Sequence, residues 1–459
     1  EQREREREQM SGPLLDGQPM MKVTPSGLRS HLLQHPVTDA VSMATFILSL
    51  RGIGPEADPN MLAGLMGGFR RLPEVVPGYS FKELWDLLFS LAARTHPLLR
   101  GAQHRGMEVF DDGPSLPILS QNESASVTLT RAEIGCILAN ACLLNLVDVE
   151  HEQSIGSLAL GDIFTSSHRV AVERVVCLLL YFVYWADPDH SMLGDNGTCD
   201  TVTFERVAQG MEEMPKWEES TRPIDTAGVR VHSGVMEESN CIGFADFANR
   251  DIHIHCVIGS ATQEEVLFSC CPEAFVGLLL YPRLLDGTDG SKSEVGVIRN
   301  ARRVCSYTGY DRTFTAGPPL STLVSHDILV YDACYSGQFY RRNLDRDLYK
   351  AYLGFRAVPD ISTGKWGCGV FNGVPLYKFL TQLMACGETG TRMDYSAFKD
   401  EDHCTMCIDA LECIEGWNEG QGMTVGSLYT LILDVVQDHK EWTRASQFKE
   451  AMMQRLRGE

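Results

Sequence analysis

The chain has 459 residues, which is enough for two or three domains with a sizeable core. Hydrophobic residues make up 44% of it and charged residues 22%, as is usual for a soluble globular protein. The formal net charge of −21 argues against general binding of DNA or RNA, which requires a broad basic surface. It does not exclude one anionic ligand in a locally positive pocket.

Fifteen cysteines, several of them in apolar segments, indicate reduced thiols and therefore an intracellular protein. The first thirty residues lack the apolar core of a signal peptide, and the longest apolar run, Val175 to Ala186, is too short to span a bilayer. Nucleus and cytoplasm are the expected compartments. An organelle stays open, because the sequence begins at Glu1 rather than Met and a targeting segment is not excluded.

The first half of the chain is predicted to be mainly helical. Apolar residues recur at helical spacing from Phe81 to Leu91. A stretch with Gly and Pro, Gly113 to Pro117, separates this region from a second block, which opens with the capping-box pattern Thr130-x-x-Glu133. Such a Thr hydroxyl and Glu carboxylate satisfy free backbone amides at a helix start. Helices are predicted over 81–91, 130–144 and 170–185.

After about residue 222, short β-branched and aromatic runs alternate with helical segments. This alternation predicts a mixed α/β layer in which the strand ends are free to build a pocket. Strands are predicted over 229–231, 241–247, 328–333 and 393–398. Helices are predicted over 273–285, 348–355, 375–385, 404–414 and 425–437.

The triplet Gln263-Glu264-Glu265 is the leading candidate for chemistry, and it begins seventeen residues after Asp246. An amide beside two carboxylates allows one acid to donate a proton while its neighbour holds a sugar hydroxyl. By itself such a triplet is also common on solvated helix faces, so the segments around it must decide. A second pattern, His403-Cys404-x-x-Cys407, has half the spacing of a zinc site, but no second pair completes it, and we expect no metal there.

Several ordered segments between Leu129 and Phe398 resemble the catalytic region of poly(ADP-ribose) glycohydrolase, a macrodomain-fold enzyme with a helical accessory region. In the second half these segments are Asp246-Phe-Ala-Asn249, Gln263-Glu264-Glu265, Tyr307-Thr-Gly-Tyr310 and Thr363-Gly-Lys-Trp-Gly-Cys-Gly-Val-Phe371. Upstream, Leu129-Thr130-x-x-Glu133, Leu138-Ala-Asn-Ala141 and Cys177 to Phe182 resemble the accessory region.

This resemblance implies an α/β fold, with a macrodomain-like mixed sheet flanked by helices and an α-helical N-terminal and accessory region. It implies hydrolysis of the ribose–ribose O-glycosidic bonds of poly(ADP-ribose) to release ADP-ribose, without a metal or organic cofactor. The domains expected are a variable helical N-terminal region (1–115), a helical accessory region (116–222), a macrodomain-like catalytic core (223–440) and a charged tail (441–459). The N-terminal helical region is a candidate surface for protein partners.

The resemblance also implies roles for single residues. Glu265 would be the general acid and then the base that activates water, and Glu264 would hold ribose hydroxyls. An acid that donates a proton near neutral pH needs a raised pKa, which burial or an adjacent carboxylate supplies. Taken singly, each aromatic residue also fits core packing, and each polar one fits a turn cap or a surface position. The implied substrate-binding residues are Asp246, Asn249 and Gln263 at the reacting ribose, Tyr310 and Phe371 around the diphosphate and distal ribose, Phe398 stacked on adenine, and Glu237 as acceptor for the adenine amine.

One departure from the family pattern is His253-Ile254-His255, where the family has three consecutive glycines. Glycines there allow the backbone to approach a diphosphate, and a β-branched Ile is a poor replacement. Either the histidines donate to phosphate oxygens, or the chain is an impaired or inactive member that serves as a scaffold subunit; a His-x-His metal site is a third reading. Lys365 stands where the family has Asn, and it would add positive charge near phosphate.

Overall fold

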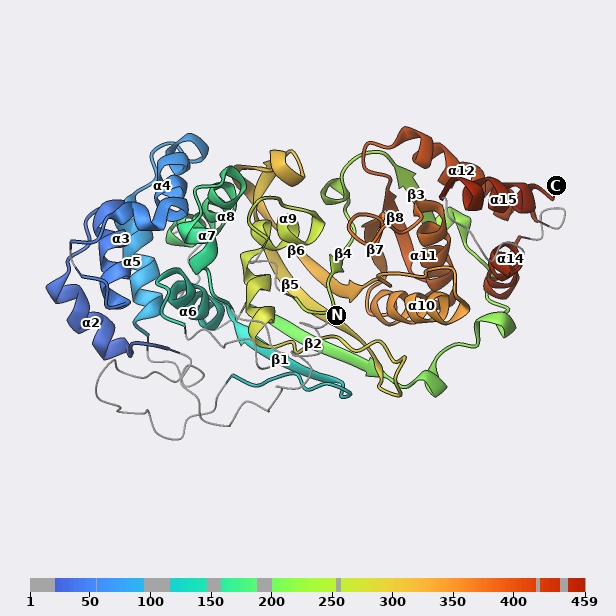
Figure 1. Ribbon diagram of the computed structural model, residues 1–459, viewed down its shortest axis with the longest axis horizontal. Coiled ribbons are helices and arrows are strands. Elements are labelled where there is room, and N and C mark those ends of the chain that lie inside the picture. The colour runs from blue at the N-terminus through green and yellow to red at the C-terminus, as the bar shows by residue number, and fades with distance from the viewer. Residues whose placement is uncertain are drawn as a thin grey trace.

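The computed structural model describes residues 21–54, 56–94, 116–146, 158–187, 200–252, 257–417, 422–437 and 445–458. Within these residues an eight-stranded mixed sheet crosses the molecule, with the strand order β1-β2-β5-β6-β4-β7-β8-β3 (Figure 1). The strands are β1 (Ala125–Thr130), β2 (Thr201–Gln209), β3 (Val229–His232), β4 (Gly243–Ala248), β5 (Ser293–Thr308), β6 (Thr315–Asp332), β7 (Asp360–Gly364) and β8 (Arg392–Ser396).

The two halves of this sheet differ in strand direction. Strands β1, β2, β5 and β6 pair antiparallel in that order. Strands β6, β4, β7, β8 and β3 pair parallel. The carboxyl ends of these parallel strands therefore lie along one edge of the sheet, where α/β proteins commonly bind ligands.

Helices cover both faces of the sheet, and Figure 1 shows α2 to α8 gathered at one end of the molecule and α10 to α15 at the other. The first group consists of α2 (Pro25–Gln34), α3 (Ala40–Leu50), α4 (Ala63–Val75), α5 (Phe81–Ala92), α6 (Arg131–Cys142), α7 (Gly161–Thr165) and α8 (Arg169–Ala186). The others are α9 (Gln263–Cys270), α10 (Arg341–Phe355), α11 (Pro375–Thr389), α12 (Glu401–Glu415), α14 (Val425–Gln437) and α15 (Ala445–Arg457).

Two hydrophobic cores lie on opposite faces of the sheet. Alternate residues of a strand point to opposite faces, and β6 follows this rule. Its Ile328 and Val330 belong to the core beneath the N-terminal helices and α9, whereas Leu329 and Tyr331 belong to the core beneath α10 and α11. The sheet therefore separates a helical half from an α/β half and joins them through shared strands.

The predicted fold class is confirmed, and local signals account for several elements. Thr130 caps α6, since its hydroxyl accepts from the Glu133 N–H at 3.2 Å, while the Glu133 carboxylate accepts from the Thr130 N–H at 2.6 Å. This is the capping box that the sequence predicted. The apolar run predicted as a buried helix is α8, whose residues from Val175 to Phe182 are all buried.

One helix prediction was wrong. The helix expected over 273–285 is a 3₁₀ helix, Pro272–Leu279, which begins with Pro and ends six residues earlier. The accessory segment expected over 116–222 contains the helices α6 and α8, and β1 and β2 also lie within it. The charged tail expected from residue 441 contains α15, which buries Phe448 and Met452 completely in the second core. This segment is amphipathic, because its apolar residues are buried although many of its residues are charged.

The thirteen cysteines within the described residues are all free thiols, as the sequence predicted. Among the same residues, no helix combines the length and the apolar character needed to cross a membrane.

Candidate functional site

A cavity of about 530 Å³ opens at the carboxyl ends of the parallel strands. Its walls come from the end of β4, the first turn of α9, the turn between β5 and β6, and the segments that follow β7 and β8. Eight of the nine predicted site residues line it, and Asp246, the ninth, is completely buried on β4. The lining set is Glu237, Asn249, Gln263, Glu264, Glu265, Tyr310, Phe371 and Phe398.

The first turn of α9 is fastened to β4 by the side chain of Gln263. Its Oε1 accepts from the Phe247 N–H at 2.8 Å, and its Nε2 donates to the Ala245 carbonyl at 2.7 Å. The Gln263 side chain therefore makes two hydrogen bonds to the backbone of β4 of the kind that a neighbouring strand makes. It fixes the two glutamates that follow it relative to the strand end.

Three carboxyl groups, those of Asp246, Glu264 and Glu265, are buried beside one another, with exposed fractions of 0%, 8% and 4%. Neither oxygen of Asp246 has a hydrogen-bond partner among the described residues, nor does Oε1 of Glu264. Burial raises the pKa of Asp246, and the nearby Glu265 raises it further. Burial also raises the pKa of Glu264, as do Asp246 and Glu265. Asp246 and Glu264 therefore retain their protons to a higher pH than isolated carboxyls do.

Two groups oppose this effect at Glu264. The backbone N–H of Asn249 donates to its carboxylate, and the guanidinium of Arg174 lies near enough to lower its pKa in part. Arg174 comes from α8, has a side chain that is almost fully buried, and donates to the Val257 carbonyl. Since Val257 lines the cavity, the helical half of the molecule supports its wall directly.

Glu265 lines the cavity and also caps a helix. Its Oε2 accepts from the Thr262 N–H at 2.8 Å and also from the Thr262 hydroxyl, so it caps the start of α9. The positive end of the short helix lies at the same place. A carboxylate held in this way has little freedom to turn away from the cavity.

One wall of the cavity is aromatic. The rings of Tyr310 and Phe398 are 4.9 Å apart and tilted by 54°. Phe398 has a φ of +45°, a left-handed conformation that is unfavourable for a large side chain. The Ser396 hydroxyl, which accepts from the Phe398 N–H at 3.1 Å, helps to hold it. Burial and the neighbouring Glu265 raise the pKa of Tyr310 to about 12.

Glu237, which lines the cavity, lies in a single 3₁₀ turn, Met236–Glu238. Burial raises its pKa, while the Tyr307 hydroxyl donates to its carboxylate. Arg303 donates to the Glu237 carbonyl at 3.2 Å. The sequence pattern 307–310 was noted, but only its second tyrosine was assigned to the site; Tyr307 lines the cavity as well.

The Gly-rich segment after β7 forms the remaining wall. Gly367 has a φ of +69°, and a Cβ there would lie 2.5 Å from the Cβ of Ala333, so only glycine fits. The preceding Trp366 is completely buried, and its indole N–H donates to the Tyr331 carbonyl at 3.3 Å. Nζ of Lys365 lies 3.5 Å from the Asp400 carboxylate, and both residues line the cavity.

The segment His253-Ile254-His255 lies outside the described residues. The sequence reading also missed Arg174. Its signal was the charged pair Glu173-Arg174 at the start of the apolar stretch of α8.

Among the described residues, one set of three metal-ligand side chains lies close together. The Sγ atoms of Cys177, Cys270 and Cys305 are within 4.8 Å of one another, and all three residues are buried in the first core. They do not line the cavity. The cavity itself offers carboxylates, amides and aromatic rings, which suit a sugar and a purine base.

Comparisons with known proteins point to one family. Residues 214–405 match the family model described as poly(ADP-ribose) glycohydrolase, macro domain fold, and residues 77–206 match the model of its helical domain. The chain is 25% identical over 314 residues to poly(ADP-ribose) glycohydrolase 1 of Caenorhabditis elegans, and the match covers 61% of this chain and 37% of that protein. It is 27% identical over 294 residues to poly(ADP-ribose) glycohydrolase 2 of the same nematode, and that match covers 57% of each chain. A probable poly(ADP-ribose) glycohydrolase 2 of Arabidopsis thaliana is 24% identical over 442 residues, with 79% and 77% covered. The chain thus spans less than two thirds of the two nematode relatives.

Proposed function

Because the chain belongs to the poly(ADP-ribose) glycohydrolase family, we propose that it hydrolyses the ribose–ribose O-glycosidic bonds of poly(ADP-ribose) and releases ADP-ribose. One observation carries the proposal. A cluster of three buried carboxyls and the Tyr310–Phe398 ring pair meet at one cavity. The volume of about 530 Å³ suits a ligand the size of one nucleotide sugar.

In this proposal Phe398 stacks on adenine, and Glu237 accepts a hydrogen bond from its amine. Tyr310, Phe371 and the Gly-rich segment pack around the diphosphate and the distal ribose. That ribose then reaches the acid end, where Glu264 holds its hydroxyls. The reacting ribose is supported by Gln263, Asn249 and Asp246. The Gln263 amide fixes the first turn of α9, and the Asn249 N–H fixes the Glu264 carboxylate.

Glu265 then serves as acid and base. It donates a proton to the oxygen of the leaving ribose as the bond from that oxygen to the ring carbon breaks. Water bonds to the same carbon and returns a proton to Glu265, so the acid is regenerated. A neighbouring carboxylate stabilises the positive charge that develops on the sugar ring in the transition state. No organic or metal cofactor takes part in these steps.

The test uses Glu265→Gln with Glu133→Gln as a matched control. Both glutamates accept from the N–H and hydroxyl of a capping Thr, at Thr262 and Thr130 respectively, and Gln preserves a capping box at either place. Release of ADP-ribose from the polymer is expected to fall about a hundred- to ten-thousand-fold in Glu265→Gln and to stay unchanged in Glu133→Gln. Equal rates in the two variants would show that Glu265 is a capping residue only.

A second candidate function is that of an impaired or inactive family member acting as a scaffold subunit, with the N-terminal helical region as its surface for protein partners. The observation that favours it is His253-Ile254-His255 in place of three glycines. Titration calorimetry with ADP-ribose separates the two candidates. The scaffold predicts no binding by the unmodified protein and restored binding after all three residues are changed to Gly, whereas tight binding by the unmodified protein excludes it.

A further inference from the structure

A second cavity, of about 370 Å³, adjoins the first on the side of Phe371. It is lined by the turn 334–338, which follows β6, and by the segment 371–373, which follows the Gly-rich wall. Phe371 lines both cavities, so its ring forms part of the partition between them. The second cavity holds none of the residues assigned to adenine or to the acid cluster.

The strand order fixes the place of this second cavity. The strands run β6-β4-β7-β8, so the turn after β6 and the segment after β8 lie on opposite sides of β4 and β7. Phe398 follows β8 and marks the adenine end, whereas Ala333 and the turn 334–338 follow β6. A ligand whose adenine lies against Phe398 therefore has its distal ribose nearer to Phe371. A polymer that continues beyond that ribose meets the second cavity.

The rim of this cavity carries an exposed aromatic side chain. Tyr335 is 71% exposed, and its ring meets that of Phe371 edge to face at 5.3 Å. Val370, on the adjoining segment, is 73% exposed. Exposed aromatic rings beside a cavity are the groups on which nucleic-acid bases stack, irrespective of base sequence.

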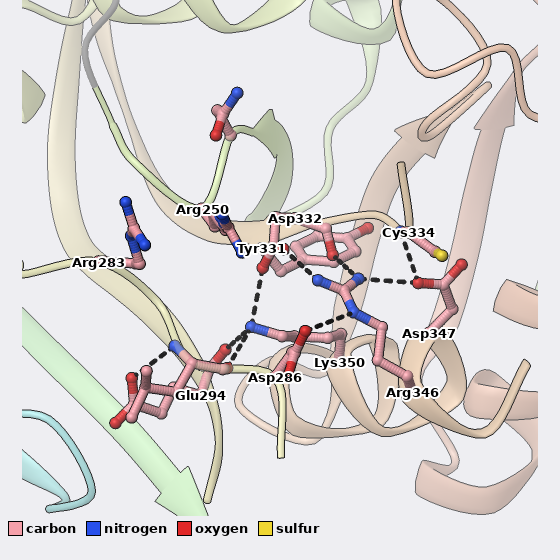
Figure 2. A network of polar contacts seen from close by, with 12 residues as sticks. Arg250, Arg283, Asp286, Glu294, Tyr331, Asp332, Cys334, Arg346, Asp347 and Lys350 are labelled. Carbon is pink, nitrogen blue, oxygen red and sulfur yellow. Dashed lines mark hydrogen bonds and ion pairs between the residues drawn. The ribbon is translucent and has the colours of Figure 1, made fainter. Parts of the chain in front are cut away.

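Buried ions hold the turn in place (Figure 2). Oδ1 of Asp347 accepts from the Cys334 N–H at 2.9 Å, and the same carboxylate pairs with Arg346. Asp347 also pairs with Lys378. Asp332, the last residue of β6, pairs with Arg346 and lies 2.8 Å from Nζ of Lys350. All five side chains are at most 5% exposed. Charges this deeply buried are costly, so they point to a turn whose geometry matters.

The two walls of the cavity are also tied to each other. Oε1 of Gln338 accepts from the Val374 N–H at 2.9 Å, and the Gln338 carbonyl accepts from the Tyr377 hydroxyl at 2.6 Å. The turn after β6 and the segment after Phe371 are thus held as one unit. A preformed site of this kind loses little conformational entropy when a ligand binds.

We propose that the second cavity binds the polymer unit on the leaving side of the scissile bond, with its purine base stacked on Tyr335. This inference rests on the proposed function, and it names the substrate class as a chain of at least two ADP-ribose units. Phe371 then separates the two units, and Tyr335 sets a preference for polymer over single ADP-ribose. Tyr335 touches the leaving unit and not the reacting ribose.

The test measures binding in a Glu265→Gln background, which prevents turnover. Titration calorimetry is run with ADP-ribose, which fills the first cavity only, and with a two-unit polymer. The two-unit ligand is expected to bind about ten-fold more tightly, as one base stacked on an aromatic ring allows. Adding Tyr335→Ala is expected to remove that gain and to leave the affinity for ADP-ribose unchanged.

Two controls show whether the ring itself is responsible. Tyr335→Phe keeps the ring and is expected to keep the ten-fold gain. Leu33→Ala removes an 87% exposed apolar side chain from α2 and is expected to change neither affinity. If both ligands bind the parent protein equally, this inference fails while the proposed function stands. An equal loss for both ligands in Tyr335→Ala also overturns it, and failure of both to bind the parent protein removes the proposed function with it.

Discussion

Two aspartates on neighbouring parallel strands have opposite electrostatic surroundings. Asp246 lies on β4 and Asp332 ends β6, and in the register of these strands Asp332 is opposite Ala248, two residues beyond Asp246. Both side chains are buried. Burial alone would raise the pKa of Asp332, but Arg346 and Lys350 outweigh it and lower the pKa. At Asp246 burial and Glu265 act together and raise it.

The difference separates a structural site from a reactive one. Around Asp332 every buried charge has an opposite charge beside it, and the result is a fixed strand end and turn. Asp246, Glu264 and Glu265 are crowded together, and Arg174 partly offsets the effect of this crowding at Glu264. A protonated carboxyl beside a carboxylate is the arrangement that acid catalysis of glycoside cleavage uses.

Removing one charge from each site gives the largest expected contrast. Asp332→Asn leaves Lys350 without a carboxylate partner and Arg346 with Asp347 as its near counter-charge, and the free energy of unfolding is expected to fall by about 3–5 kcal/mol. Asp246→Asn replaces an acid whose charged form is uncompensated, so we expect a loss below about 1 kcal/mol, or a gain. Urea denaturation of the two variants and the parent protein measures both values. Equal losses would mean that Asp246 is ionised and paired in the folded protein.

A pH series sharpens the same contrast. A carboxyl with a raised folded-state pKa contributes stability that is present below its unfolded pKa and is lost as the pH rises through the folded pKa. Asp246 is such a group, so the stability of Asp246→Asn relative to the parent is expected to rise from pH 5 to pH 8, by at most about 1.4 kcal/mol per pH unit.

The pKa of Asp332 is shifted in the opposite direction, so this residue provides the control. Its pKa is lowered, so its contribution is present above the ordinary aspartate pKa and is lost only as the pH falls through the lower folded value. The stability difference between Asp332→Asn and the parent is therefore expected to stay constant from pH 5 to pH 8. Parallel curves for Asp246→Asn and the parent would contradict the raised pKa of Asp246.

Local signals in the sequence predicted much of the fold. The capping box at Thr130 and the apolar run of α8 are encoded within a few residues, and both were found where expected. Strand β5 was missed because its middle is polar. Arg299 in that strand is satisfied by Glu205, 94 residues away, and by Asp327 on β6, and a local window does not reveal such partners.

The site divides in the same way. The ordered sequence motifs identified acids and aromatic residues that line one cavity. The roles of the individual residues stay predictions. Arg174 was missed because its importance depends on the packing of α8 against the Val257 carbonyl, 83 residues away. Tyr335 was missed because nothing in its local sequence marks the turn after β6 as a wall of a second cavity.

The smallest effect is expected at Lys365, which is paired like the structural ions but lies in the cavity like the reactive ones. Its side chain is 26% exposed, and Asp400 is its partner at 3.5 Å. If the ammonium attracts the diphosphate, Lys365→Asn should raise the Kd for ADP-ribose roughly two- to five-fold, the size of a solvent-screened ion pair. Calorimetry at low and moderate salt measures this, and the difference between parent and variant should shrink as salt is added.

Asp400→Asn is expected to change the Kd for ADP-ribose in the opposite direction. The Asp400 carboxylate accepts from the His403 N–H at 3.0 Å and so caps α12, and Asn caps helices equally well, so the fold is expected to persist. Without its partner the Lys365 ammonium is released toward the ligand, and the Kd for ADP-ribose should fall. A rise in Kd in both variants would assign the pair to the wall of the cavity alone. Opposite changes would mean that the cavity uses one partly paired cation for binding, whereas the network beneath the turn uses fully paired cations for shape.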